Sequence, residues 1–396
     1  MAIAAAAGML MGGMSVPAKA ADLGGDCCAD LEERVAELEA TTVRKGNRKV
    51  SVTLYGWVNQ AVMWYDNGEE SDVYVVDNAH AESRIGVKGS GKVRPGLSIA
   101  YRLELGTSAD RNGGVDANDA DDAARIRIRQ LWWSITDDNL GTITVGQQYP
   151  GSAGTGATEV GGAGGWEDYS FGATDALNIS VYDSVAGTYV GSWFARLPNL
   201  DPGRLNLVKY TSPEFAGFTA SASWGEDDRW DVGLTYAKDW NGVYVAAGVG
   251  YYEDTDNGDG NVYSGVNSDV EKVWSASLGI YHAASGLYGE AGYFKYDDDL
   301  GGVSLIDAST WYGKIGIRKN WSGMGETDIY AQWQHSDDFM GNATDADMYG
   351  VGLGQDIDAV GATAYLSWKH YQADETAIGN NVDDLDTVTA GMIVPF

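Results

Sequence analysis

From Val50 onward the chain is a succession of short segments in which apolar and polar residues alternate with a period of two. Successive side chains of an extended strand point to opposite faces, so each segment has one apolar face and one small or charged face. Residues 97–105 show the pattern, because Leu97, Ile99 and Leu103 alternate with Ser98, Ala100, Arg102 and Glu104. Such a polar face lines water rather than a packed core. The chain is therefore expected to be all-β.

After the N-terminal segment, no stretch contains eighteen consecutive apolar residues, which excludes a spanning helix. A chain of strands crosses a membrane only as a closed barrel, where every backbone polar group is paired. Sixteen strands are predicted, near 50–65, 80–90, 96–106, 124–136, 141–149, 204–212, 217–225, 230–239, 242–252, 271–283, 286–296, 308–320, 326–336, 347–355, 359–373 and 384–396. We predict a transmembrane antiparallel β-barrel of sixteen strands, which leaves an aqueous channel.

The predicted connections alternate between short glycine turns and long acidic loops. The long acidic loops include Asp66–Ala79, Glu253–Val270, Asp297–Asp307 and Asp374–Asp383. This alternation is typical of outer-membrane barrels. With an even number of strands, both termini lie on the short-turn side, which is expected to be the periplasm. Weak binding of Ca²⁺ or Mg²⁺ to these carboxylates is expected, whereas no cofactor is.

Composition excludes several function classes. The chain has 14 Trp and 23 Tyr against 7 Phe, which suits aromatic girdles at the two membrane interfaces. Its net charge of −31 excludes nucleic acid as a partner. The four His have no metal-ligand spacing, and no G-x-S-x-G motif is present, so an enzyme is not expected.

The N-terminal 48 residues divide into two parts. Residues 1–20 are small and apolar and end in Ala18-Lys19-Ala20, which predicts a signal peptide with a truncated start. Residues 21–48 are expected to be a periplasmic segment before the barrel domain, 49–396. Within it, a short helix over 30–40 has coiled-coil spacing, at Cys28, Leu31, Val35, Leu38 and Thr42. So short a helix needs support, either from an existing assembly or by packing against the barrel mouth.

One strand carries a row of arginines. Arg125, Arg127 and Arg129 alternate with Ile126 and Ile128. A charge facing lipid is costly, so the arginines are predicted to face the lumen. The same parity brings Arg84, Lys88 and Arg102 to the lumen, where opposed charges would create a transverse field. The alternative is that the row only balances structural carboxylates such as Glu104.

The connection from Pro150 to Gly203 is far longer than usual for a loop without a role. An ordered set of segments surrounds it: Ala21-Asp22-Leu23, the helix over 30–40, residues 83–89, Gly141–Gln148, Tyr210–Phe218 and the terminal Phe396. Together these segments resemble the alphaproteobacterial general porin family over essentially the whole mature chain. The last strand, ending in Phe396, is similar to the assembly signal of outer-membrane barrels.

The resemblance implies a homotrimer of the outer membrane, in contact with lipopolysaccharide, whose third loop folds into the lumen. It implies passive diffusion of small hydrophilic solutes and ions, and a tether to peptidoglycan through Ala21 and Asp22. The third loop would supply the acidic side of the constriction, with candidates Glu159, Glu167, Asp168, Asp175 and Asp183.

Two alternatives stay open. The first is a solute-specific channel for sugars or anions, for which loop 3 offers aromatic residues Trp166, Tyr169, Phe171, Tyr189, Trp193 and Phe194, though loop packing explains these equally. The second is a barrel that serves chiefly to anchor the envelope.

Overall fold

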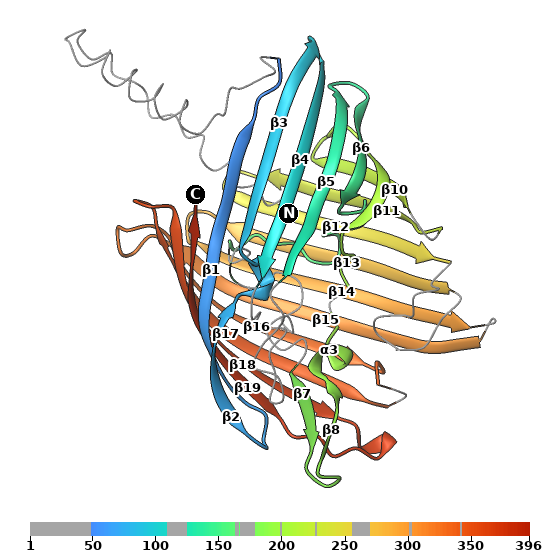
Figure 1. Cartoon of the computed structure of the whole chain (residues 1–396), viewed down its shortest axis with the longest axis vertical. Coiled ribbons are helices and arrows are strands. Elements are labelled where there is room, and N and C mark those ends of the chain that lie inside the picture. The colour runs from blue at the N-terminus through green and yellow to red at the C-terminus, as the bar shows by residue number, and fades with distance from the viewer. Residues whose placement is uncertain are drawn as a thin grey trace.

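The computed structural model describes residues 49–108, 125–162, 166, 179–198, 200–225, 228–255, 270–300, 303–340 and 343–396. The predicted signal peptide, the N-terminal segment and its helix lie outside these residues. One antiparallel sheet makes up the body of the molecule (Figure 1). Its strands are β1 (Thr53–Asp66), β2 (Ser71–Asp77), β3 (Arg84–Arg94), β4 (Leu97–Ser108), β5 (Arg125–Asp137), β6 (Gly141–Gln148), β9 (Leu205–Thr211), β10 (Phe218–Gly225), β11 (Trp230–Asp239), β12 (Val243–Asp254), β13 (Val270–His282), β14 (Leu287–Leu300), β15 (Val303–Lys319), β16 (Thr327–Asp337), β17 (Asp345–Ile357), β18 (Ala362–Asp374) and β19 (Leu385–Pro395).

The sheet closes on itself because its first and last strands pair. β1 pairs with β19 from Trp57 opposite Pro395 to Asp66 opposite Asp386. The terminal Phe396 extends this ladder, since its backbone N–H donates to the carbonyl of Gly56 and its carbonyl accepts from the Gly56 N–H. The sheet has seventeen strands, but β2 and β3 pair with successive parts of β1 and share one position. The barrel therefore has sixteen strand positions, which confirms the prediction.

Two of the predicted long loops are wrong. Residues 66–79 contain β2, which pairs with β1 from Gln60 to Asp66, so the actual turn is only residues 67–70. The 3-10 helix Ala79–Ala81 then separates β2 from β3. In the region 297–307, β14 and β15 continue as a paired hairpin to Leu300 and Val303. The acidic residues of this region resembled a loop in the sequence because the two strands extend beyond the apolar zone, where both of their faces meet water.

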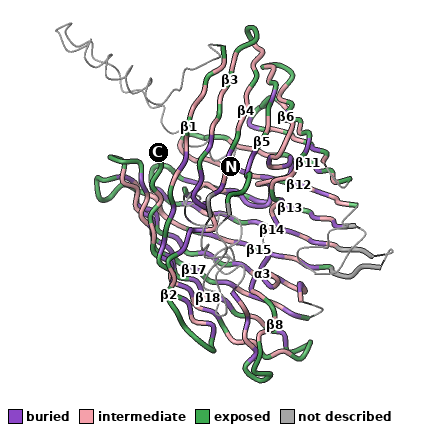
Figure 2. Tube along the Cα trace, in the orientation of Figure 1, coloured by how far each residue is buried: buried purple, intermediate pink, exposed green. Residues whose placement is uncertain are grey.

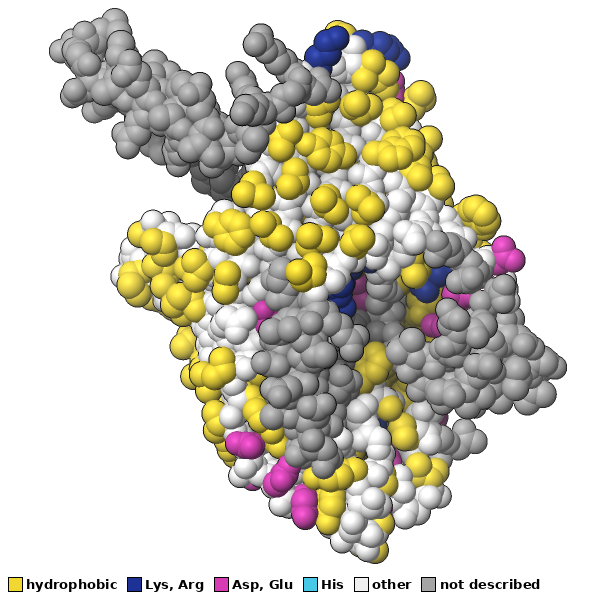
Figure 3. All heavy atoms as spheres, in the orientation of Figure 1, with side chains coloured by type: hydrophobic (Ala, Val, Ile, Leu, Met, Phe, Trp, Pro, Cys, Tyr) yellow, Lys and Arg dark blue, Asp and Glu magenta, His cyan; other side chains and the backbone are white. Residues whose placement is uncertain are grey.

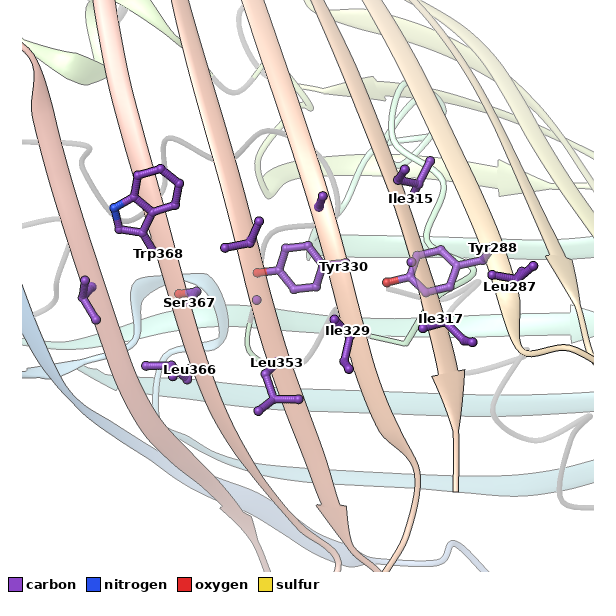
Figure 4. A pocket seen from close by; sticks show the side chains of 15 residues that line it. Leu287, Tyr288, Ile315, Ile317, Ile329, Tyr330, Leu353, Leu366, Ser367 and Trp368 are labelled. Carbon is purple, nitrogen blue, oxygen red and sulfur yellow. The ribbon is translucent and has the colours of Figure 1, made fainter. Parts of the chain in front are cut away.

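The outer face of the barrel is apolar and exposed. Figure 2 shows exposed and buried residues alternating along the strands, and the exposed large side chains include Val351, Leu353 and Leu366. Hydrophobic side chains also cover the outside of β1, β3 and β4, while Lys and Arg gather at the tip of β3 and β4 (Figure 3). A shallow apolar groove crosses the outside of β14–β19, lined by Ile315, Ile329 and Leu366 among others (Figure 4). This inside-out distribution of hydrophobic residues is the pattern of a barrel that faces lipid.

An aromatic girdle marks one edge of the apolar zone. Tyr251 lies between Trp230 and Trp274, with ring centroids 5.3 Å and 4.4 Å apart, and Tyr293 lies 4.3 Å from Trp311. Across β10–β18 the outward aromatic residues of this edge are Trp224, Trp230, Tyr251, Trp274, Tyr293, Trp311, Trp333, Tyr349 and Trp368. Trp240 and Trp321 are exposed at the short-turn end. The distribution agrees with the girdles predicted from composition.

Within the described residues, no helix has the length and apolarity needed to cross a membrane. The connection between β6 and β9 contains a small hairpin, β7 (Ser180–Asp183) with β8 (Thr188–Ser192), and the one-turn helix α3 (Trp193–Arg196). Neither element was predicted from the sequence, because four to five residues are too few to show a period.

Candidate functional site

The arginines of β5 occupy the inner wall, and a β-bulge sets their arrangement. Arg125 and Arg127 pair with Ser108 and Gly106 of β4. The ladder then shifts between Glu104 and Leu105, which leaves Arg129 as the extra residue of the bulge. A bulge re-aims a side chain. Here it brings Arg129 and its neighbour Gln130 to the same inner face, both buried, while Ile126 and Ile128 are exposed outside.

Two carboxylates hold these arginines together. Glu82, which follows the 3-10 helix, accepts from Arg127 Nη2 at 2.5 Å and from Arg129 Nη1. Glu104 accepts from Arg129 Nε at 3.0 Å, from Arg84 Nη1 at 3.4 Å and from the Tyr55 hydroxyl at 2.8 Å. Three guanidinium groups therefore share two carboxylates, which leaves this cluster with one excess positive charge.

The three arginines differ in access to water. The side chains of Arg84 and Arg129 are 1% and 6% exposed, whereas that of Arg127 is 44% exposed. Arg84 also stacks on Trp57, with its Cζ atom 4.2 Å from the ring centroid. Arg84 and Arg129 therefore have the geometry of the alternative interpretation, in which arginines balance structural carboxylates. Arg127 presents its charge to the lumen.

Lys88 and Arg102 lie farther along the same wall, toward the β3–β4 turn. They are directly opposite each other on β3 and β4. The ring of Tyr55 is 5.0 Å from Lys88 Nζ and 5.4 Å from Arg102 Cζ. Arg102 also donates to the amide oxygen of Gln130 at 3.3 Å. The cationic groups of Lys88 and Arg102 are thus positioned by the ring of Tyr55, and that of Arg102 also by the amide of Gln130.

Loop 3 runs along the inside of the opposite wall. Near its start, the N–H groups of Gly151 and Ser152 donate to Ser223 Oγ and Asp231 Oδ1 at 3.0 Å and 2.8 Å. The hydroxyl of Thr155 then lies 2.6 Å from that of Ser275. These contacts follow β10, β11 and β13 in order, so the loop is a belt on the inner surface.

Glycines of the wall make room for this belt. A methyl group at Gly248 would lie 2.6 Å from the carbonyl oxygen of Thr155, and one at Gly292 would overlap the carbonyl oxygen of Gly156. Glycine allows such close approach of two backbones. The loop and the wall are therefore matched in shape.

The predicted loop residue Glu159 lies beside a buried polar group on β14 and β16. Glu290 accepts from the N–H groups of Val160 and Gly161 at 2.6 Å and 2.9 Å. The Tyr288 hydroxyl donates to Asp328 Oδ1 at 2.9 Å. Glu159 therefore lies on the belt, near the carboxylates of Glu290 and Asp328 and the cation Lys314.

Aromatic stacking anchors the middle of the loop. Trp166 is 4% exposed and lies 5.6 Å from the rings of both Tyr330 and Tyr365. Its carbonyl accepts from Asn78 at 3.0 Å. Trp193 is fully buried, 5.7 Å from Tyr371. Two of the aromatic residues considered for a sugar path are therefore packing residues.

The end of the loop is bound to the β18–β19 connection. Arg196 pairs with Glu375, and both side chains are 1% exposed. Asp183 accepts from the N–H groups of Val185 and Ala186 at 2.9 Å and of Asn381 at 3.1 Å. Those donors hold the pKa of the Asp183 carboxyl below its ordinary value. The side chain of Asp183 therefore stabilises the β7–β8 turn and ties it to the β18–β19 connection.

Several predicted residues lie outside the described part of the chain: Glu167, Asp168, Asp175, Ala21 and Asp22. Arg125 is described only in its backbone. Within the described residues, no group of three or more His, Cys, Asp or Glu could hold a metal ion.

Two further basic residues, which were not predicted from the sequence, lie on the inner wall. Lys209 donates to the Tyr149 carbonyl at 2.7 Å, and Arg204 to the Tyr149 hydroxyl at 3.2 Å. Strand parity could have found Lys209, because Val208 and Tyr210 on either side of it face outward. Glu82 gives no such signal, since it sits where the 3-10 helix interrupts the strand pattern.

The fold agrees with a comparison to known families. The family model described as Gram-negative porin matches residues 2–392. The chain belongs to the Gram-negative porin family. This porin is therefore an outer-membrane diffusion channel, in a family of channels rather than enzymes. Comparison with curated protein sequences gives no match.

Several solved structures share the fold at low sequence identity. The anion-selective porin from Comamonas acidovorans is 17% identical with a TM-score of 0.59, covering 88% of this chain and 100% of that chain. OprB of Pseudomonas putida is 10% identical with a TM-score of 0.61, covering 93% and 97%. DcaP of Acinetobacter baumannii is 12% identical with a TM-score of 0.54, covering 89% and 99%.

Proposed function

We propose that this porin admits small hydrophilic solutes and ions by passive diffusion past a constriction between Arg127 and the loop 3 belt. The observation that supports this most is the course of loop 3 around the inside of the barrel, from β6 along the inner faces of β10, β11, β13 and β14 to the β18–β19 connection. Figure 3 shows the hollow of the barrel, with charged side chains of both signs inside. A transverse field between these walls would favour polar over apolar solutes.

Liposome swelling tests this proposal against a solute-specific channel. Purified protein is reconstituted and diluted into sugars of increasing size. A diffusion channel gives swelling rates that fall with size and are equal for glucose and galactose. Strong preference for one of two equal-sized sugars would favour the solute-specific alternative, and absence of swelling in any sugar would contradict the proposal.

We also propose the assembly state, the orientation and the N-terminal tether of this porin, on the basis of its resemblance to alphaproteobacterial general porins. The assembly would be a homotrimer with both termini in the periplasm. The end of the barrel that carries the long loops would face lipopolysaccharide. Ala21 and Asp22 would tether the protein to peptidoglycan, and Phe396 would serve as the assembly signal. The domain division at residues 20 and 48 belongs to the same proposal. Weak Ca²⁺ or Mg²⁺ binding at the acidic loops would bridge to lipid phosphates.

A further inference from the structure

Lys88 and Arg102 are an unusual pair for a β-sheet. They lie directly opposite each other on neighbouring strands, both on the inner face. Like charges in that position repel and destabilise a sheet. The next position on the inner face of β3, Ser90, carries no charge, so the paired cations are a local feature of this wall.

No carboxylate of the described residues neutralises this pair. The groups that face it are Tyr55 and Thr53 from β1, and Gln130 and Trp132 from β5. Glu104, two residues from Arg102 on the same face of β4, already accepts from Arg84, Arg129 and Tyr55. Within the described residues, the rings of Tyr55 and Trp132 and the amide of Gln130 hold the two cations in position.

Aromatic rings orient cations without cancelling their charge. Tyr55 lies within 5.0 Å of Lys88 Nζ and 5.4 Å of Arg102 Cζ, and its hydroxyl is fixed by Glu104 at 2.8 Å. Lys88 is exposed and Arg102 is half-buried, so water and solutes reach both. The result is a fixed, accessible double positive charge.

We propose that Lys88, Arg102 and the ring of Tyr55 form a binding site for small oxyanions on the lumen wall, between the arginine cluster and the short-turn mouth. An oxyanion such as phosphate would accept hydrogen bonds from the guanidinium and the ammonium and would relieve their repulsion. The site rests on the proposed diffusion function and adds a local anion step to it. It is separate from the cluster around Glu82.

The test compares single channels of the wild type with the double variant Lys88→Gln/Arg102→Gln. Chloride current is recorded in KCl with and without inorganic phosphate on both sides. Phosphate is expected to reduce the wild-type chloride current and to have no such effect on the double variant. Loss of the two charges should also lower the chloride-to-potassium permeability ratio about two- to fivefold.

Lys238→Gln is the matched control. Lys238 also lies over an aromatic ring, 4.7 Å from Trp240, near the short-turn end, but it sits on the outside of the barrel. It should behave as wild type. If the double variant does not assemble, Lys88→Glu serves instead, because it creates an ion pair with Arg102 and should abolish the phosphate effect.

An unchanged phosphate response and permeability ratio in a conducting double variant would overturn the site while leaving the diffusion function intact. A wild type without conductance would instead refute the proposed function. The two failures are thus distinguishable.

Discussion

At the scale of single residues, the same residue type has two uses on one strand. Arg129 is buried between Glu82 and Glu104, whereas Arg127 keeps 44% of its side chain exposed. A buried charge that loses its partner is costly, whereas a charge in water is not. Only the three-dimensional positions of Glu82 and Glu104 separate these arginines, which strand parity treats alike.

Arg127→Ala is expected to raise conductance and cation preference and to leave the barrel folded. Its charge faces water, and Glu82 retains Arg129 as a partner. Single-channel recording with a reversal potential measures both effects. The control is Ile128→Arg, which puts a charge on the lipid face at a cost of about 2–4 kcal/mol near the midplane and should impair assembly.

Arg129→Ala should behave differently from Arg127→Ala. Arg129 is buried and pairs with both Glu82 and Glu104, so its loss weakens two buried carboxylates, whereas the loss of Arg127 weakens Glu82 alone. Each carboxylate keeps one arginine, so the cost should lie below the about 3–5 kcal/mol of a buried charge that loses its partner. The thermal unfolding midpoint should fall.

Normal assembly of Ile128→Arg together with misfolding of Arg127→Ala would mean that the inner and outer faces of β5 are reversed.

At the scale of elements, loop 3 is held by close backbone contact with the wall, by the stacked ring of Trp166 and by the Arg196–Glu375 pair.

Sequence patterns predicted sixteen strands because each one alternates over many residues. They missed β2, whose acidic neighbours resembled a loop, and the β7–β8 hairpin, which is too short to show a period. The anchors of the loop join residues far apart in the chain, such as Arg196 with Glu375, and no local pattern reveals such pairs.

Gly292→Ala should displace loop 3 from its seat, since the added methyl group would overlap the carbonyl oxygen of Gly156. Conductance and current noise are expected to rise. Gly289→Ala on the same strand is the control, because its methyl group would meet nothing closer than 3.9 Å. Equal channel behaviour of the two variants would contradict the seating of the loop on this glycine.

Acid should loosen the hairpin of loop 3. The pKa of Asp183 is lowered by its backbone donors, so its contribution to stability is full above the ordinary value and is lost as pH falls through the lowered value. Limited proteolysis should thus show cleavage within residues 184–187 rising below about pH 4. Asp183→Asn should show raised cleavage already at pH 7, and protection equal to wild type would count against this anchor.

At the scale of the whole molecule, an apolar exterior surrounds a charged interior in a chain of net charge −31. The acidic loops favour cations at the mouth that they surround, while the basic wall around Arg127 opposes this locally. The net preference is therefore expected to be weak and to decrease as salt rises, because screening acts over about 10 Å at 0.1 M.

The assembled protein is expected to be a heat-modifiable trimer. The coiled-coil spacing from Cys28 to Thr42 is too short to associate alone, so contacts between barrel walls would supply most of the stability. Mass measurement in mild detergent should give three chains, and electrophoresis should show a shift on heating. A monomer at micromolar concentration would contradict the trimer.

Single-channel recording of the purified wild type in a KCl gradient tests the central claim most directly. A water-filled diffusion channel should give an ohmic current that grows with salt without saturating, and a small reversal potential of the sign for cations at low salt. Absence of conductance, or a current that saturates and reverses near the equilibrium potential of one ion, would contradict it.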